Sequence, residues 1–221
     1  MAKYFTLATI NPSKDTIIYN NAIQRSIKAG VVWTIPNCSN KLLLNLLSGE
    51  KMEIILSITP LELNEKLVNS LEKLILKQID IVKNTPTTQG LEQGKYYEKN
   101  PGSIKATIAS LLYKWDQDLA NKKISILDLA IDLMIRLVRG HFLSNGNKRL
   151  GIISCGAFLA SVGLYLKWSN NKVQYLNSWE KIMIQIAEGK ISKDIEEIKE
   201  KLNLTKIFEE SIYLSIKWIE V

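Results

Sequence analysis

The longest uncharged run of the chain extends from Leu150 to Leu166 and constrains the fold more than any other segment. Basic residues flank it on both sides, and three glycines and two serines dilute its hydrophobicity. A membrane span needs roughly 20 apolar residues, so this run lies at the low edge of a span. We expect a buried central helix over about 147–163 and no membrane-spanning segment.

A second apolar helix is predicted just before this run. Ser125 precedes it, and Asp128 follows three residues later, which is a capping box with Asp in the usual Glu position. The helix is predicted to extend to about Arg139, with Gly140 able to end it. Its polar stripe places acids first and bases last, as the helix dipole prefers. Two adjacent apolar helices joined by a short polar loop indicate a mainly α fold.

Composition sets the broad class of the protein. The chain has 221 residues, 46% apolar and 23% charged, which is typical of one large or two small globular domains. Its two cysteines, Cys38 and Cys155, form no Cys-x-x-Cys pair, which excludes a zinc ribbon or a thioredoxin-type site. They leave a disulfide open but favour a reduced, cytoplasmic protein. The first residues predict no signal peptide.

The remaining elements are predicted from local patterns of apolar and turn residues. Before residue 60 we expect strands over 4–9 and 16–19, a turn-strand-turn over 30–36 and a buried helical turn over 42–47. After it we expect a helix from Glu62, a long loop over 85–102, a helix over 104–115, a helix from after Ser178 to near Gly189, and a short charged helix opened by Ser192. The tail, 207–221, is predicted as a helix or a final strand pair.

Charge is distributed unevenly around the only histidine, His141. One histidine excludes zinc sites built on several imidazoles and mechanisms with two histidine acid–bases. The net charge is +7, and no acidic residue occurs between Asp132 and Glu180. The six basic residues in that window are Arg136, Arg139, Lys148, Arg149, Lys167 and Lys172. They indicate a phosphate or polyanion partner, with a solvated lysine-rich surface as the alternative.

Residues 139–149, with the sequence RGHFLSNGNKR, suit phosphate chemistry. A neutral imidazole on His141 can accept a hydroxyl proton near pH 7. The turn at 145–147 can point successive backbone N–H groups at one anion, at the start of the next helix. Lys148 and Arg149 add mobile positive charge. A base, an anion nest and cations so close together indicate phosphoryl transfer, whereas the glycine spacing does not fit a P-loop.

This segment resembles the active loop of the Fic/Doc family, His-x-Phe-x-Asp/Glu-Gly-Asn, followed by Gly-Arg in the Fic branch or Lys-Arg in the Doc branch. The residues that match at the correct spacing are His141, Gly146, Asn147, Lys148 and Arg149. Ile152 stands where the Fic branch has a second arginine, and Arg139 matches a common Doc-type pattern. The resemblance covers roughly residues 90–202 and favours the Doc branch.

Two positions depart from the family pattern. Leu143 stands where the family has the phenylalanine that anchors the loop in the core, and Phe142 can compensate. Asn145 stands where the family has the acidic residue that holds the Mg²⁺ of the bound nucleotide. Because an amide oxygen is a weaker, uncharged ligand, the alternatives are slower catalysis and a decayed, inactive scaffold.

The resemblance implies a mainly α, Fic/Doc-type helical bundle with the active loop between two central helices, and with possible short strands near the N-terminus. We expect an N-terminal extension of unknown role over 1–85, a catalytic domain over 86–206 and a C-terminal segment over 207–221.

The implied activity is transfer of a phosphate from ATP, with Mg²⁺, to a Ser or Thr hydroxyl of a target protein, such as elongation factor Tu for Doc. His141 would be the base, and Lys148 and Arg149 would stabilise the transferring phosphates. The nucleotide would be bound by Arg139, Asn145, Gly146, Asn147, Lys148 and Arg149, with Asn145 near the metal. Arg139 would support either the nucleotide or the geometry of the loop. The alternatives are AMP transfer, as in the Fic branch, and a decayed Fic-fold binding module.

The expected partners are a target protein and a separate antitoxin. The antitoxin is expected because the self-inhibiting Ser/Thr-x-x-x-Glu-Gly/Asn pattern of many Fic proteins is absent: only Glu188 is followed by Gly or Asn, and Ile184 stands four residues before it. A membrane partner is not expected. A nucleic-acid partner is disfavoured, because no aromatic stacking array accompanies the basic residues.

Overall fold

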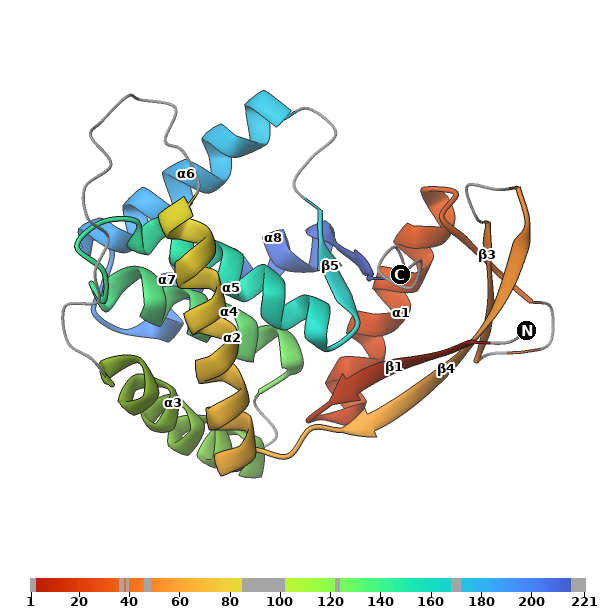
Figure 1. The fold of residues 1–221 in the computed structure, drawn as a ribbon, viewed down its shortest axis with the longest axis horizontal. Helices are drawn as coiled ribbons and strands as arrows, with labels where there is room; N and C mark the ends of the chain where they lie inside the picture. Colours follow the sequence, from red (N-terminus) through yellow and green to blue (C-terminus); the bar gives the residue numbers. More distant parts are fainter. Residues whose placement is uncertain are drawn as a thin grey trace.

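The computed structural model describes residues 3–35, 38, 40–45, 49–84, 102–121, 124–167 and 172–215. Its helices are α1 (Pro12–Lys28), α2 (Glu65–Asn84), α3 (Ser103–Ala120), α4 (Ile126–Arg139), α5 (Asn147–Ser161), α6 (Lys172–Glu188), α7 (Ile195–Lys201) and α8 (Leu204–Ser211). Its strands are β1 (Lys3–Thr9), β2 (Val32–Thr34), β3 (Lys41–Asn45), β4 (Lys51–Pro60), β5 (Leu164–Leu166) and β6 (Ile212–Leu214). The mainly α fold class is confirmed. Figure 1 shows α2–α8 gathered on one side and a small sheet with α1 on the other.

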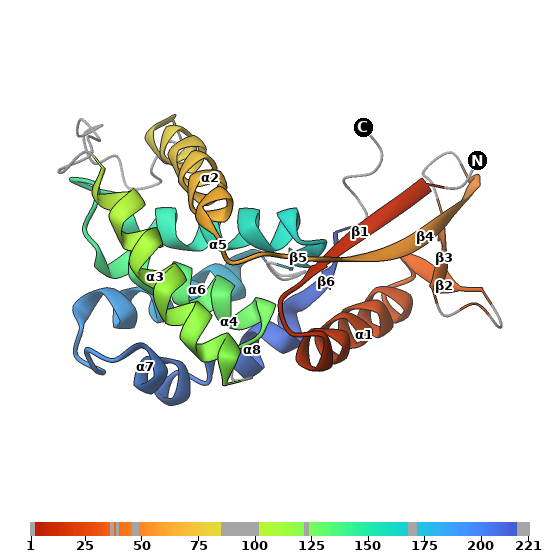
Figure 2. The ribbon, with the colours of Figure 1, turned by 90° about the horizontal axis from the view of Figure 1, so that it is seen from below.

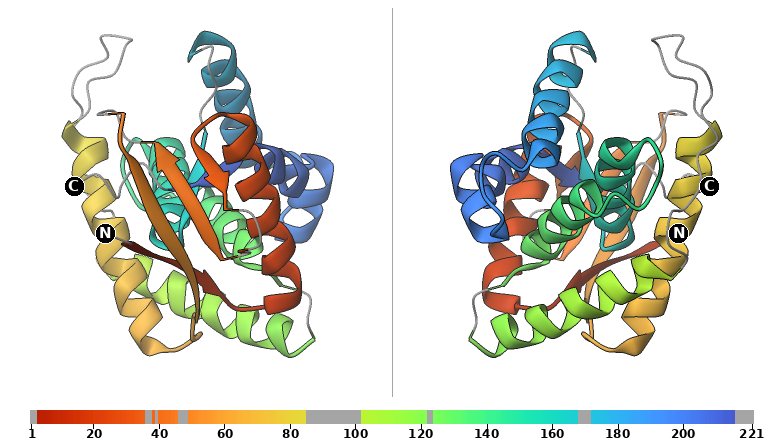
Figure 3. Two further views of the ribbon diagram at one scale, coloured as in Figure 1. Left: turned by 90° about the vertical axis from the view of Figure 1, so that its right-hand side faces the viewer. Right: turned by 90° about the vertical axis from the view of Figure 1, so that its left-hand side faces the viewer.

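The sheet has the strand order β1-β4-β3-β2. β1 pairs parallel with β4, and the other two pairings are antiparallel. Along β1, buried Phe5 and Leu7 alternate with exposed Tyr4 and Thr6, which is the period of two expected for a sheet with one covered face. α1 runs along that face in Figure 2, and the sheet and α1 lie in front of the helical part in the left view of Figure 3.

Two local predictions in the N-terminal part are wrong. The predicted strand over 16–19 lies inside α1. Its β-branched residues favour a strand locally, but Pro12 opens a helix there and Ile18, Tyr19 and Ala22 bury one face of it against the sheet. The predicted helical turn over 42–47 is a strand as far as residue 45, and 46–47 lie outside the described residues.

The reason for the second error is the burial pattern of three successive leucines. Leu42 and Leu44 are buried and Leu43 is only half-buried, so the chain has the period of a strand. Leucine's helix propensity is a weak prior that the pairing with β2 and β4 overrides. β4 was not predicted, whereas the strands expected over 4–9 and within 30–36 are present as β1 and β2.

The later elements follow the predictions more closely. α6 begins at Lys172, earlier than expected, and α5 ends at Ser161. Of the expected loop over 85–102, only residue 102 lies within the described residues. The tail holds both predicted alternatives, because α8 ends at Ser211 and β6 then pairs with β5; residues 216–221 lie outside the described part.

α4 is the centre of the helical part and packs against α5 and five other helices. The Ser125–Asp128 capping box is confirmed: Ser125 Oγ accepts a hydrogen bond from Asp128 N, and the Asp128 carboxylate accepts one from Ser125 N. α5 approaches closely at Gly151, where a Cβ would lie 2.4 Å from a methyl group of Val138. The two predicted central helices are therefore packed directly against each other, with the loop 140–146 between them.

A buried carboxylate joins the N-terminal part to α4. Asp15 is fully buried, and its Oδ2 accepts hydrogen bonds from Thr9 Oγ1, Ile10 N and Asn11 N at 2.8–2.9 Å. Its Oδ1 accepts one from Ile126 N at 2.8 Å, at the first turn of α4. α1 is therefore bonded to the same helix that leads into the loop.

Replacing Asp15 with asparagine is expected to lower the free energy of unfolding by about 1–3 kcal/mol. The amide has nearly the same shape, but its NH₂ group must face at least one backbone N–H, which leaves a buried donor without an acceptor. Urea unfolding followed by circular dichroism measures the change. Asn21→Asp, at an exposed position of the same helix, is the control, and equal midpoints for Asp15→Asn and the wild type would contradict the prediction.

Candidate active-site loop

His141 stands at the exit of α4, directly after the C-cap residue Gly140. Its backbone φ is +48°, in the left-handed region. Such a conformation costs a non-glycine residue on the order of 1–3 kcal/mol, although histidine adopts it more often than most residues do. The imidazole is exposed. The only histidine of the chain therefore lies at the surface. Its backbone is strained, so neighbouring residues must stabilise that conformation.

The residues after His141 help to fix its backbone conformation. Phe142 and Leu143 are buried, with 5% and 0% of their surface exposed. The Asn147 side chain binds the backbone of Leu143 twice: Oδ1 accepts from Leu143 N, and Nδ2 donates to Leu143 O, both at 2.8 Å. Leucine in the place of the family's phenylalanine therefore still anchors the loop, and Phe142 is buried beside it.

The turn that follows is left-handed at Gly146 and leads directly into α5. Gly146 has φ +88° and is the N-cap of α5, and its N–H donates to Asn145 Oδ1 at 2.7 Å. α5 is 15 residues long, and the backbone N–H groups of its first turn lie at this end of the loop. Lys148 is exposed and Arg149 half-buried on that first turn. The predicted turn and helix start are confirmed, and the arrangement suits a phosphate group.

Arg139, the last residue of α4, points to a different part of the chain. Its Nη1 donates to the carbonyl oxygens of Ser192 and Lys193 at 3.0 and 3.1 Å. These residues belong to the turn between α6 and α7, and the side chain of Arg139 is half-buried against it. Thus 145–149 form one continuous turn and helix start, whereas the Arg139 guanidinium binds a turn more than fifty residues further along the chain.

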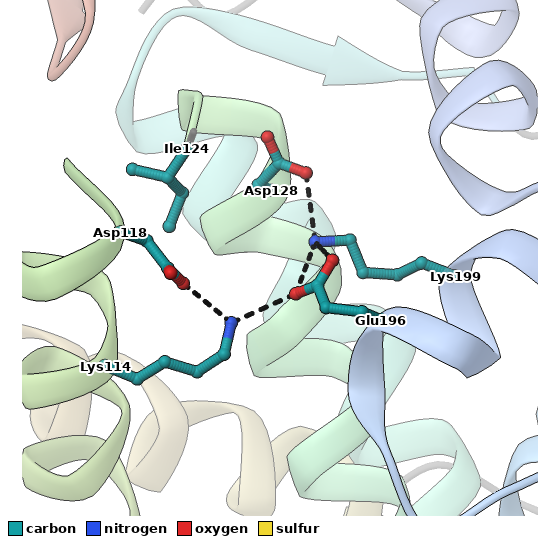
Figure 4. A pocket seen from close by; sticks show the side chains of 6 residues that line it. All are labelled: Lys114, Asp118, Ile124, Asp128, Glu196 and Lys199. Carbon is teal, nitrogen blue, oxygen red and sulfur yellow. Dashed lines mark hydrogen bonds and ion pairs between the residues drawn. The ribbon is translucent and has the colours of Figure 1, made fainter. Parts of the chain in front are cut away.

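A charged cluster that the sequence did not predict lies at the other end of α4 (Figure 4). Lys199 of α7 is 3.0 Å from Asp128, 3.2 Å from Asp132 and 3.1 Å from Glu196. Lys114 of α3 is 3.2 Å from Asp132 and 3.0 Å from Glu196. All of these residues except Asp132 line a pocket of about 220 Å³, together with Asp118 and Ile124. It joins three helices by their side chains.

Burial and charge act against each other on the pKa values of the cluster. Burial lowers the pKa of Lys199, but Asp132 and Asp128 outweigh it and hold that pKa above its ordinary value. Burial raises the pKa of Asp128, but Lys199 and hydrogen bonds from Ser125 outweigh it and hold that pKa below its ordinary value. Asp132 is fully buried, and burial raises the pKa of its carboxyl against the pull of the two lysines. The cluster therefore depends on every charge being paired.

The sequence contains a signal for this cluster. Asp128 and Asp132 lie four residues apart on a largely apolar helix, and the sequence predicts them as part of its polar stripe with Arg136 and Arg139. Asp132 is instead buried, and it also accepts a hydrogen bond from Trp115 Nε1 at 3.1 Å. An acid in the middle of an apolar helix predicts a buried partner, but the sequence does not say which lysines provide it.

None of the helices that the structure describes is both long and apolar enough to cross a membrane. Within the same residues, no group of three or more His, Cys, Asp or Glu side chains is placed to hold a metal ion.

Comparison with known proteins finds one relationship. Residues 61–159 match the family model described as the Fic/DOC family. The match includes the whole loop 139–149 and begins before the boundary expected at residue 86. It supports the Fic/Doc resemblance without distinguishing the Doc branch. No curated protein and no solved structure matches the chain significantly.

Proposed function

We propose that this chain, whose residues 61–159 match the Fic/DOC family, transfers a phosphate from ATP to a hydroxyl group of a target protein. The family match supports a Fic-type transferase in general. The observation that carries the proposal is the loop itself. It presents an exposed imidazole, a left-handed glycine turn at a helix start and two basic side chains within nine residues, 141–149.

The loop residues can divide the reaction between them. The neutral imidazole of His141 accepts the proton of the target hydroxyl, whose oxygen then bonds to the γ-phosphorus of ATP. The bond from that phosphorus to the β-phosphate oxygen breaks, and ADP leaves. Lys148 and Arg149 balance the charge on the transferring phosphate, and the backbone N–H groups of the first turn of α5, from Asn147 onward, hold the neighbouring phosphate oxygens.

The donor set at Asn145 is poor for Mg²⁺. Its amide oxygen is uncharged and already accepts the Gly146 N–H at 2.7 Å. Hard divalent cations prefer carboxylates and water, so an ion arriving with ATP would rest mainly on the phosphates and water, with Asn145 as its protein contact. Proton acceptance and stabilisation of the phosphates are therefore assigned to the protein groups alone.

The loop sequence favours phosphate transfer over AMP transfer. Lys148 follows Asn147, as in the Doc branch, and Ile152 is half-buried where the Fic branch has its second arginine. The family match covers both branches, so AMP transfer is the second candidate function. Elongation factor Tu is the first target to test, and a separate antitoxin is the expected inhibitor.

The proposal is tested by incubating the purified chain with elongation factor Tu, and in parallel with a desalted bacterial lysate, in ATP labelled at the α- or the γ-phosphate. We expect γ-label alone on a target protein, loss of that label with His141→Ala, and its retention with Arg136→Ala. Arg136 is the matched control because it is an exposed base one turn earlier on α4.

Each other outcome has a defined meaning. Label from α-labelled ATP would show AMP transfer. Equal labelling by His141→Ala would overturn the assignment of the base. Absence of both labels, together with no binding of ATP and Mg²⁺ in calorimetry, would favour a decayed binding module.

A further inference from the structure

We propose that Arg139 is a positioning residue, which fixes the backbone of His141 by binding the turn 189–193, and that it does not act as a ligand of the nucleotide. The proposal concerns the same loop and rests on the proposed function for its kinetic consequences. Its structural part, the control of the His141 conformation, can be tested without any activity.

The backbone of His141 must be fixed on both sides. Its φ of +48° is unfavourable for a side-chain-bearing residue and persists only when the surrounding structure determines it. On the C-terminal side, Leu143 is buried and clamped by Asn147. On the N-terminal side, Gly140 continues α4 with helical φ and ψ, and its N–H donates to Arg136 O at 2.8 Å. The anchor on this side is therefore the end of α4, and that end needs a fixing contact to the rest of the protein.

Arg139 is the described side chain that provides it. Both hydrogens of its Nη1 are used, because that one atom donates to the carbonyl oxygens of Ser192 and Lys193. Its Nη2 lies at Gly189, 3.7 Å from where a Cβ would stand. The guanidinium is thus hydrogen-bonded to one end of the turn and lies near Gly189 at the other end. The planar guanidinium of arginine presents several N–H donors in a fixed geometry to these carbonyl groups, whereas a lysine ammonium does not.

The turn is itself fixed to the rest of the protein. Ser192 Oγ accepts a hydrogen bond from Asp194 N at 3.0 Å, and Lys201 Nζ donates to Ile191 O at 3.2 Å. Asp194 caps α7, which carries Lys199. α7 is therefore joined to the first half of α4 through Lys199, and the turn before α7 is joined to the end of α4 through Arg139. Because this turn is fixed to α7, it can fix Arg139, and Arg139 in turn restrains the backbone of His141 two residues later.

The structural test uses the only histidine of the chain. Protein without a polyhistidine tag, labelled with ¹⁵N and ¹³C in histidine alone, has one imidazole signal set, which belongs to His141. We expect Arg139→Ala to shift that set and split or broaden it into several conformers. We expect Arg136→Ala to leave it unchanged. An unaltered His141 signal in folded Arg139→Ala would overturn the proposal, whether or not the chain transfers phosphate.

A second pair of variants changes the turn that Arg139 binds and leaves Arg139 itself unchanged. Gly189 has φ +66°, which asparagine tolerates and valine does not. Gly189→Val is expected to perturb the His141 signal as Arg139→Ala does, and Gly189→Asn is expected to preserve it. If Arg139→Ala does not fold, this pair decides alone: equal spectra for Gly189→Val and Gly189→Asn would overturn the proposal.

Kinetics then separate positioning from nucleotide binding. If transfer is observed, Arg139→Ala is expected to lower kcat on the order of 100-fold with the KM for ATP unchanged, because a small displacement of the base acts on the chemical step. A raised KM for ATP with kcat retained would mean that Arg139 binds the nucleotide, and would also overturn the proposal. Absence of transfer in the wild type counts against the proposed function and leaves the spectroscopic result standing.

Discussion

Replacing Lys199 with methionine is expected to lower the free energy of unfolding by about 3–5 kcal/mol. Methionine matches the length and most of the volume of the side chain but removes the ammonium that contacts three carboxylates. Asp132 has no exposed surface, and it would keep only Lys114 as a cationic partner. Breaking one side of a buried charge cluster is far more costly than losing an exposed ion pair. Urea unfolding followed by circular dichroism measures the difference.

Lys201→Met is the matched control for this variant. Lys201 is on the same helix, pairs with Glu197 and donates to Ile191 O, but these contacts are exposed and both charged side chains are about half exposed. We expect its unfolding midpoint to stay close to that of the wild type, since exposed ion pairs contribute little. A small effect for Lys199→Met, comparable to that of the control, would show that the cluster is hydrated and that its burial carries little energy.

Replacing Gly140 with alanine is expected to reduce transfer activity on the order of 100-fold, with a stability loss of about 1–3 kcal/mol. An alanine Cβ there would lie 2.0 Å from Cε2 and 2.4 Å from Cζ of the Phe142 ring. The ring is buried, so it cannot rotate away without leaving its packing site. His141 lies between the two residues, and any displacement of the ring changes its backbone. Labelling assays and urea unfolding of the same preparation measure the two effects.

A second substitution distinguishes this clash from other causes. Phe142→Leu removes the ring atoms that the new methyl group would meet, so Gly140→Ala/Phe142→Leu is expected to recover part of the activity lost in Gly140→Ala. If the double variant is no better than the sum of the two single variants predicts, the close contact does not explain the requirement for glycine at this position.

Features encoded by neighbouring residues could be predicted from the sequence. The Ser125–Asp128 cap and the turn at Gly146 each lie within four residues, and both have the predicted geometry. The candidate loop was found for the same reason, because its base, turn and cations are consecutive along the chain. The ligand roles of these residues stay predictions until nucleotide binding is measured.

Features that depend on distant partners could not be predicted. Arg139 binds backbone carbonyls of the turn before α7. Every residue has such a carbonyl, so the sequence does not identify these partners. The lysines that neutralise Asp132 come from α3 and α7, so only the need for a partner was visible. The two errors near the N-terminus have the same origin. In both segments, packing and strand pairing outweighed propensities of a few tenths of a kcal/mol per residue.

The bond between Asp15 and the first turn of α4 bears on the order in which the protein folds. It joins residues 111 positions apart, whereas the cap beside it closes within three. Local contacts form early, and contacts of high sequence separation form late. The capped amino end of α4 can therefore form early, whereas its bond to Asp15 forms only when the N-terminal segment packs against it. The segment that matches the family begins at residue 61. Expressed alone, it would lack the acceptor for Ile126 N, and we therefore expect it to be less stable than the same segment within the full chain.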